Sequence, residues 1–185
     1  MAVDVQITPE MIERCYEFAS EIILGDNQYD RLPNTVDKRI ERTFVGKLSE
    51  LVFYNYICSR GINYDIGDMF EIYDGQENVD GYDFITRNGI TIDIKSASRT
   101  DHYMIMVPID QFENIPKDYY VGVKINTGVT RNQDIQINDI TTATIYGYCD
   151  YNYLANRYTK SYGEGPCKAA QLERLLDIED IVRMF

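Results

Sequence analysis

Two oppositely charged side chains lie two residues apart near the end of a β-rich run, in the motif Asp93-Ile94-Lys95. The run spans residues 81–95 and contains an Asn-Gly turn signal at 88–89, which indicates a β-hairpin. Because residues two apart on a strand share a face, Asp93 and Lys95 are expected to project together. A carboxylate beside an ammonium can hold a divalent cation and act on the water bound to it. This chemistry suits the hydrolysis of a phosphodiester bond.

The hairpin has two plausible registers, and they orient Asp83 in opposite directions. A two-residue loop, 88–89, would point Asp83 away from Asp93, whereas a three-residue loop, 87–89, pairs the two directly. The longer loop also collects apolar side chains on the opposite face, and Gly89 suits the left-handed residue that commonly ends such a loop. The predicted pairs are therefore Thr86 with Ile90, Phe84 with Ile92 and Asp83 with Asp93.

Two further acidic residues, Glu50 and then Asp83, precede the Asp93-Ile94-Lys95 motif along the chain. The order resembles the PD-(D/E)xK nuclease superfamily, in which a helical acidic residue, a strand Asp and a (D/E)-x-K on the next strand form one metal site. The candidate catalytic residues are then Glu50, Asp83, Asp93 and Lys95. Tyr82 stands where that family often has proline, and Asp80 is an alternative for the first strand Asp.

The resemblance implies a Mg²⁺-dependent deoxyribonuclease, expected to be an endonuclease, with Mn²⁺ as the expected substitute. Asp83 and Asp93 would ligate the metal ion together with the backbone carbonyl of Ile94. Glu50 would bind a second ion or the waters around the first. Lys95 would position or help to deprotonate the attacking water, or stabilise the charged transition state. DNA is the expected partner, and a homodimer is left open.

The overall charge is unfavourable for binding nucleic acid, because a net charge of -12 repels phosphates at long range. Residues 61–86 contain no Lys or Arg, whereas basic residues gather just before Glu50. We predict either a phosphate-contacting surface or an ordinary solvated helix face for these residues, which are Lys38, Arg39, Arg42 and Lys47. Two other functions also remain open: a non-catalytic binding module with a nuclease fold, and an acidic DNA mimic that blocks a DNA-binding protein.

Hydrophobic spacing predicts a single α/β domain over residues 1–185, and the resemblance implies that its core, at about 36–150, is restriction endonuclease-like. A central mixed β-sheet flanked by helices is expected, with the hairpin at one side. Thr8 and Pro9 predict the start of an N-terminal helix over about 9–24, and a second helix is predicted over about 36–60. Later segments are predicted as strands at 103–107, 119–125 and 142–148, a short helix starting near 108, and a helical segment over about 166–185.

Gly46 lies one helical turn before Glu50 on the same face, where it would leave room for a metal ion or substrate, or permit close helix packing. At 185 residues and 44% hydrophobic, the chain can bury a core without disulfides. Its four cysteines form no C-x-x-C pair, so we expect reduced thiols and no zinc site. No apolar run is long enough to span a membrane, and a cytoplasmic location is expected.

Overall fold

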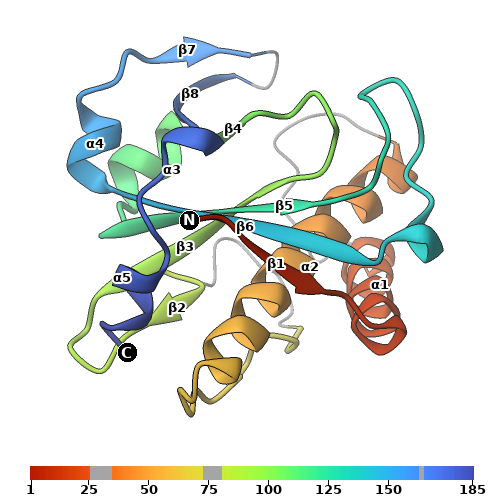
Figure 1. The fold of residues 1–185 in the computed structure, drawn as a ribbon. Coiled ribbons are helices and arrows are strands. Elements are labelled where there is room, and N and C mark those ends of the chain that lie inside the picture. The colour runs from red at the N-terminus through yellow and green to blue at the C-terminus, as the bar shows by residue number, and fades with distance from the viewer. Residues whose placement is uncertain (26–34, 73–80, 163–164) are drawn as a thin grey trace.

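A curled, mixed five-stranded sheet lies at the centre of the chain (Figure 1) in a computed structural model that describes residues 1–25, 35–72, 81–162 and 165–185. Strand β3 (Thr91–Ala97) runs parallel to β5 (Tyr119–Ile125), and the other neighbouring strands are antiparallel. The strands follow each other across the sheet in the order β1 (Val3–Gln6), β6 (Thr142–Asp150), β5 (Tyr119–Ile125), β3 (Thr91–Ala97) and β2 (Phe84–Ile85). The predicted α/β class, mixed sheet and edge hairpin are therefore confirmed.

Two long helices, α1 (Pro9–Leu24) and α2 (Val36–Ser59), cover one face of this sheet. The Thr8 hydroxyl accepts a hydrogen bond from the N–H of Met11 at 3.4 Å, and Pro9 occupies the first turn, as the sequence predicts. Thr35 caps α2 in the same way. Apolar residues of both helices pack against β3, β5 and β6 in one core cluster that includes Phe44, Leu48, Phe53, Val121 and Ile145.

The opposite face is covered by a second, smaller sheet and by short helices (Figure 1). This antiparallel sheet has the order β4 (Met104–Pro108), β8 (Pro166–Gln171) and β7 (Lys160–Ser161). The helices on this side are α3 (Ile109–Asn114) and α4 (Tyr151–Ala155). A second buried cluster joins them to the central sheet through Ile105, Phe112, Tyr120, Leu154 and Leu172. The remaining helical turns are η1 (Ile137–Asp139), η2 (Leu172–Arg174) and α5 (Glu179–Val182).

The predicted helical segment over 166–185 is wrong in its first third, because residues 166–171 form strand β8. This strand pairs with β4, which lies about sixty residues earlier, so local spacing gives no sign of it. The helical part of the C-terminus is confined to η2 and the four-residue α5. Strand β1 was also not predicted; it completes the sheet by pairing with β6.

A close backbone approach fixes the C-terminal segment against β6. Tyr148 and Leu176 exchange backbone hydrogen bonds of 3.0 and 2.8 Å, and the neighbouring Gly147 has φ +137°. A Cβ at Gly147 would lie 2.0 Å from the Leu176 carbonyl oxygen, so only glycine fits there. All four cysteines lie in the described ranges, and none forms a disulfide. Within these ranges, no helix combines the length and apolar character needed to cross a membrane.

Candidate active site

The β2–β3 hairpin adopts the predicted three-residue loop. Phe84 pairs with Ile92, and both side chains are fully buried in the main core. The N–H of Thr86 donates to the carbonyl of Ile90 at 2.9 Å, and Gly89 has φ +79° in the left-handed region. Core packing and turn chemistry thus select the register that was expected.

This register brings Asp83 to the level of Asp93 on the neighbouring strand. Asp83 lies directly before β2, and its N–H donates to the carbonyl of Ile92 at 3.1 Å. Its Oδ2 accepts a hydrogen bond from the N–H of Ile94 at 2.6 Å. Because the N–H and C=O of a strand residue point to the same side, the Ile94 carbonyl also faces the strand edge where Asp83 lies. The alternative residue, Asp80, falls outside the described ranges.

Asp93 and Lys95 project from β3 as a close ion pair. Lys95 Nζ lies 2.6 Å from Asp93 Oδ2, and each side chain retains 15% of its exposure. Lys95 also donates to Gln111 Oε1 of α3 at 3.2 Å. The sequence did not single out Gln111, which holds the lysine in place from the second face of the sheet. The lysine head group is therefore positioned by two partners rather than by solvent.

Glu50 of α2 has its own lysine partner one turn earlier. Lys47 Nζ lies 2.6 Å from Glu50 Oε2, and the two side chains are 11% and 18% exposed. The same ammonium lies 4.8 Å from the centroid of the Phe18 ring, within the range of a cation–π interaction. Lys47 therefore does not lie on a solvated helix face, because its charge is directed inward to Glu50. Its contact with phosphate stays a prediction.

The carboxylates share one electrostatic environment, centred on Asp83. Burial raises the pKa of Asp83 well above its usual range, and the negative charges of Glu50 and Asp93 raise it further. The charge of Lys95 and the hydrogen bond from Ile94 act in the opposite direction. The four predicted site residues therefore lie close enough together for each of the other three to act on Asp83.

Lys117 is a further member of this environment that sequence reasoning missed. Its side chain is buried, and its Nζ donates to the carbonyl of Ile115 at 2.5 Å. Burial lowers the pKa of Lys117, whereas the charges of Asp93 and Asp83 act to raise it. A single lysine between a short helix and a strand carries no motif. Its place beside the carboxylates follows only from the parallel pairing of β3 and β5.

The oxygen atoms of this cluster suit a hard cation, but in this structure Glu50 and Asp93 form ion pairs with lysines. Carboxylate and carbonyl oxygens are the ligands that Mg²⁺ prefers. Across the described residues, however, no three His, Cys, Asp or Glu side chains are arranged to hold a metal ion. The ammonium groups of Lys47 and Lys95 form ion pairs with Glu50 and Asp93, respectively. A divalent cation would therefore compete with these two ammonium groups for the carboxylates.

A groove runs beside this cluster between α2 and β4, and we call it the α2–β4 groove. It has a volume of about 520 Å³ and is lined by residues of α2, the end of β3, the 98–103 loop, β4, Arg131 and Tyr162. Lys38 and Arg42 line it, whereas Arg39 and Lys47 do not. The predicted basic stretch is therefore divided: two of its residues face a groove, and Lys47 faces Glu50.

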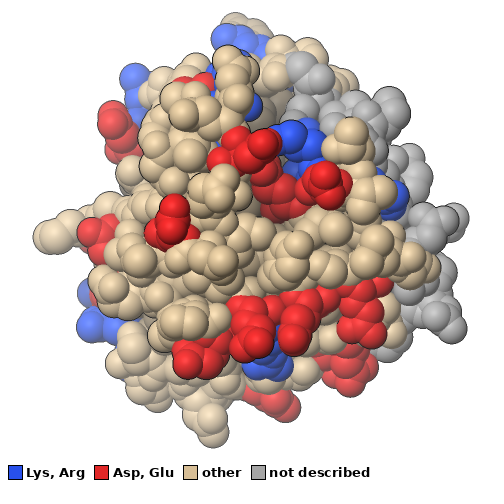
Figure 2. Space-filling model, turned by 90° about the vertical axis from the view of Figure 1, so that its right-hand side faces the viewer, with Lys and Arg blue, Asp and Glu red and all other residues tan. Residues whose placement is uncertain are grey.

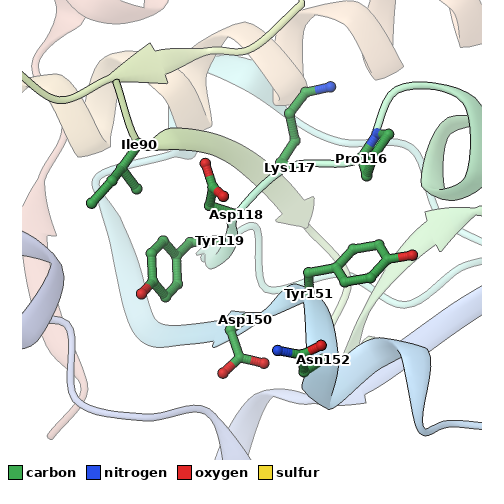
Figure 3. A pocket seen from close by; sticks show the side chains of 8 residues that line it. All are labelled: Ile90, Pro116, Lys117, Asp118, Tyr119, Asp150, Tyr151 and Asn152. Atoms are coloured by element: carbon green, nitrogen blue, oxygen red, sulfur yellow. The ribbon is translucent and has the colours of Figure 1, made fainter. Parts of the chain in front are cut away.

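A separate pocket of about 470 Å³ lies at the start of β5 (Figure 3). Its two carboxylates already have local structural partners. Asp118 accepts hydrogen bonds from the N–H and hydroxyl of Thr91, both at 2.8 Å, and Asp150 caps α4 by accepting from the N–H of Tyr153. In Figure 3 the side chain of Lys117 points away from Asp150. The pocket is thus adjacent to the acidic cluster and separate from it.

Gly46 leaves open space on the Glu50 face of α2, since a Cβ added there would meet nothing within 4 Å outside the helix backbone. Close helix packing therefore does not explain this glycine.

Comparison with known proteins finds no matching family model, no matching curated protein and no matching solved structure.

Proposed function

We propose that this protein is a metal-dependent nuclease that hydrolyses DNA phosphodiester bonds at Glu50, Asp83, Asp93 and Lys95. One observation carries the proposal: a half-buried carboxylate, Asp83, accepts a hydrogen bond from the N–H of Ile94 at 2.6 Å and lies in the combined field of Glu50, Asp93 and Lys95. Such a group is costly without a cation, and burial of like charges is typical of functional sites. The helix, hairpin and parallel strand that supply these residues support a restriction endonuclease-like core.

In this proposal Asp83 and Asp93 hold Mg²⁺, or Mn²⁺ in its place, with the carbonyl of Ile94 as a further oxygen ligand. Glu50 holds a second ion or the waters near the first. When bound, such a cation lowers the pKa of water and neutralises negative charge on the phosphate. The burial of the cluster strengthens these interactions, because charges in a low dielectric are poorly screened.

Lys95 has two roles in the proposed reaction. Without a cation, its ammonium neutralises Asp93 at 2.6 Å. With Asp93 engaged elsewhere, the ammonium remains tethered to Gln111, within reach of the space beside the carboxylates. From there the ammonium can orient the attacking water or stabilise charge on the pentacovalent phosphate, and in its neutral amine form the same group can accept a proton from that water.

An acidic DNA mimic is the second candidate, and the distribution of charge favours it. Helix α1 exposes four glutamates, Glu10, Glu13, Glu17 and Glu21. Figure 2 shows a band of acidic side chains across the lower half of the face on which α1 lies. A mimic requires such an acidic surface. It does not need a cluster of carboxylates packed beside a lysine. A nuclease fold that only binds its partner is a third candidate, with the same buried cluster but no hydrolysis.

Incubation with labelled DNA and RNA, in Mg²⁺, Mn²⁺ or EDTA, separates these functions. The nuclease reading predicts cleavage of DNA in Mg²⁺ or Mn²⁺ and none in EDTA. Binding to DNA without cleavage in any divalent metal would favour the non-catalytic module. A protein that neither binds nor cleaves DNA, but captures a DNA-binding protein in competition with DNA, would favour the mimic.

A further inference from the structure

We propose that the α2–β4 groove holds a single, unpaired strand of DNA, with Tyr103 and Tyr162 stacking against its bases. The inference rests on the proposed function, because the groove begins next to the candidate active site. Ser96, which follows Lys95 on β3, is part of its wall. On the other wall, Arg42 precedes Glu50 by eight residues, which is about 12 Å along a helix.

The charge of this groove is opposite to that of the whole chain. Four Lys or Arg side chains and two Asp or Glu side chains occur among its described lining residues, an excess of two positive charges in a chain of net charge -12. The two acidic side chains form ion pairs with Arg99 at 2.5 Å and with Arg131 at 2.6 Å. Lys38 lies 3.5 Å from Asp134, which is outside the lining, so a phosphate at the groove would share these basic groups with their carboxylate partners. The glutamates of α1 lie outside the lining residues. A phosphate backbone is therefore attracted locally despite the long-range repulsion.

Exposed aromatic side chains distinguish this groove from a simple anion site. Tyr103 is 59% exposed and Tyr162 is 42% exposed, and both line the groove. Met104 and Met106 add polarizable apolar surface between the charged groups. A basic groove with aromatic platforms is the arrangement by which proteins bind single strands, because every base offers a face for stacking. In a duplex, the base faces are stacked on each other and are not accessible to a side chain.

The size of the groove also favours one strand. Its volume of about 520 Å³ lies in the range of pockets for drug-sized ligands, which is the scale of about one or two nucleotides. A DNA duplex is far wider and would contact only the rim. The groove would thus deliver an unpaired strand to the acidic cluster, and the proposed substrate is single-stranded or locally unpaired DNA.

Binding in EDTA tests the inference without cleavage, with a labelled oligothymidylate, a duplex of matched length and inorganic polyphosphate as probes. We expect the oligothymidylate to bind tightest. Tyr103→Ala and Tyr162→Ala should each weaken its binding roughly fivefold or more, because one stacked base is lost. Tyr158→Ala is the matched control, since Tyr158 is 89% exposed and does not line the groove. Its affinity should equal that of the unaltered protein.

The salt dependence tests the phosphate contacts separately. Arg42→Gln should reduce the slope of log affinity against log salt by about 0.7, the value for one phosphate contact on a single strand. Arg183→Gln is the control, because Arg183 lies at the C-terminal end of α5 and does not line the groove. Thermal unfolding of each variant confirms that the exposed substitutions leave the fold intact.

Equal or tighter binding of the duplex would overturn the inference. Polyphosphate binding as tight as that of the oligothymidylate, with both tyrosine variants unchanged, would also overturn it. Adding Mg²⁺ to the same samples distinguishes this failure from failure of the proposed hydrolysis. Tyrosine-dependent binding without cleavage would uphold the groove and refute the nuclease, whereas cleavage of duplex DNA without single-strand preference would do the reverse.

Discussion

Replacement of Lys95 by methionine separates the two roles proposed for this lysine. Lys95→Met keeps the approximate length of the side chain and removes its charge. In EDTA the variant should be less stable, because Asp93 loses the ammonium at 2.6 Å. Asp83 also loses a positive charge that stabilises its ionised form. In Mg²⁺ the variant should bind the ion more tightly than the unaltered protein, because no ammonium competes for Asp93. It should nevertheless fail to cleave DNA.

The expected loss of stability follows from the burial of the pair. Exposed ion pairs contribute up to about 1 kcal/mol, and breaking a fully buried pair costs about 3–5 kcal/mol. With both side chains 15% exposed, a loss of about 2 kcal/mol is expected. For a domain of this size, that corresponds to a decrease in Tm of about 4–8 °C. Removing one unit charge near the cation should tighten Mg²⁺ binding by about fivefold or more, since two charges 4 Å apart repel by about 1 kcal/mol even in water.

Thermal unfolding with and without Mg²⁺, together with calorimetric titration of the ion, measures both effects. Lys160→Met is the matched control, because Lys160 is exposed on β7 and does not line the groove. The control should change neither Tm nor Mg²⁺ affinity. An unchanged Tm in EDTA together with unchanged or weaker Mg²⁺ binding by Lys95→Met would refute the idea that Lys95 balances the carboxylates.

Three further substitutions test the electrostatics of the site and the packing of the fold. The raised pKa of Asp83 means that the folded state holds its proton more tightly, so ionisation costs stability as pH rises above the ordinary value of 3.8 through the raised pKa. Asp83→Asn should therefore be more stable than the unaltered protein at neutral pH in EDTA, and the difference in stability should disappear as pH falls toward 3.8. Denaturant unfolding at several pH values measures this difference. A difference that stays constant across pH would contradict the expectation. Gly147→Ala should lose about 1–3 kcal/mol of stability, because its Cβ would lie 2.0 Å from the Leu176 carbonyl. Gly46→Ala, in an open helical position, should instead gain about 0.5–1 kcal/mol, and equal effects of the two substitutions would refute this account of the packing.

Local sequence signals predicted most of the elements that position the site. The Thr8-Pro9 start and the Phe84–Ile92 pairing were correct because capping and hairpin register depend on residues close in the chain. The second sheet was missed because β4 and β8 meet only after the chain has crossed the molecule. A six-residue segment with two buried positions, Cys167 and Ala170, does not reveal which distant strand it joins.

The sequence indicated which residues lie together in the candidate site, but not which other side chains they contact. The spacing of Asp93 and Lys95 on one strand fixes their common face, so their proximity follows from β geometry. The contact of Lys95 with Gln111 and the burial of Lys117 depend on how α3 and the following turn fold back over the sheet. Lys47 was expected at the surface because helix periodicity gives no information on Phe18, which comes from another helix.

The cleavage rate of single-stranded and duplex DNA in Mg²⁺, compared between the unaltered protein and Asp93→Asn, tests the central claim most directly. Asp93→Asn preserves the shape of the side chain and removes one carboxylate of the cluster. The account predicts Mg²⁺-dependent cleavage by the unaltered protein, abolished by EDTA and reduced at least about a hundredfold in the folded variant. No cleavage by the unaltered protein with any divalent metal, or equal cleavage by Asp93→Asn, would contradict it.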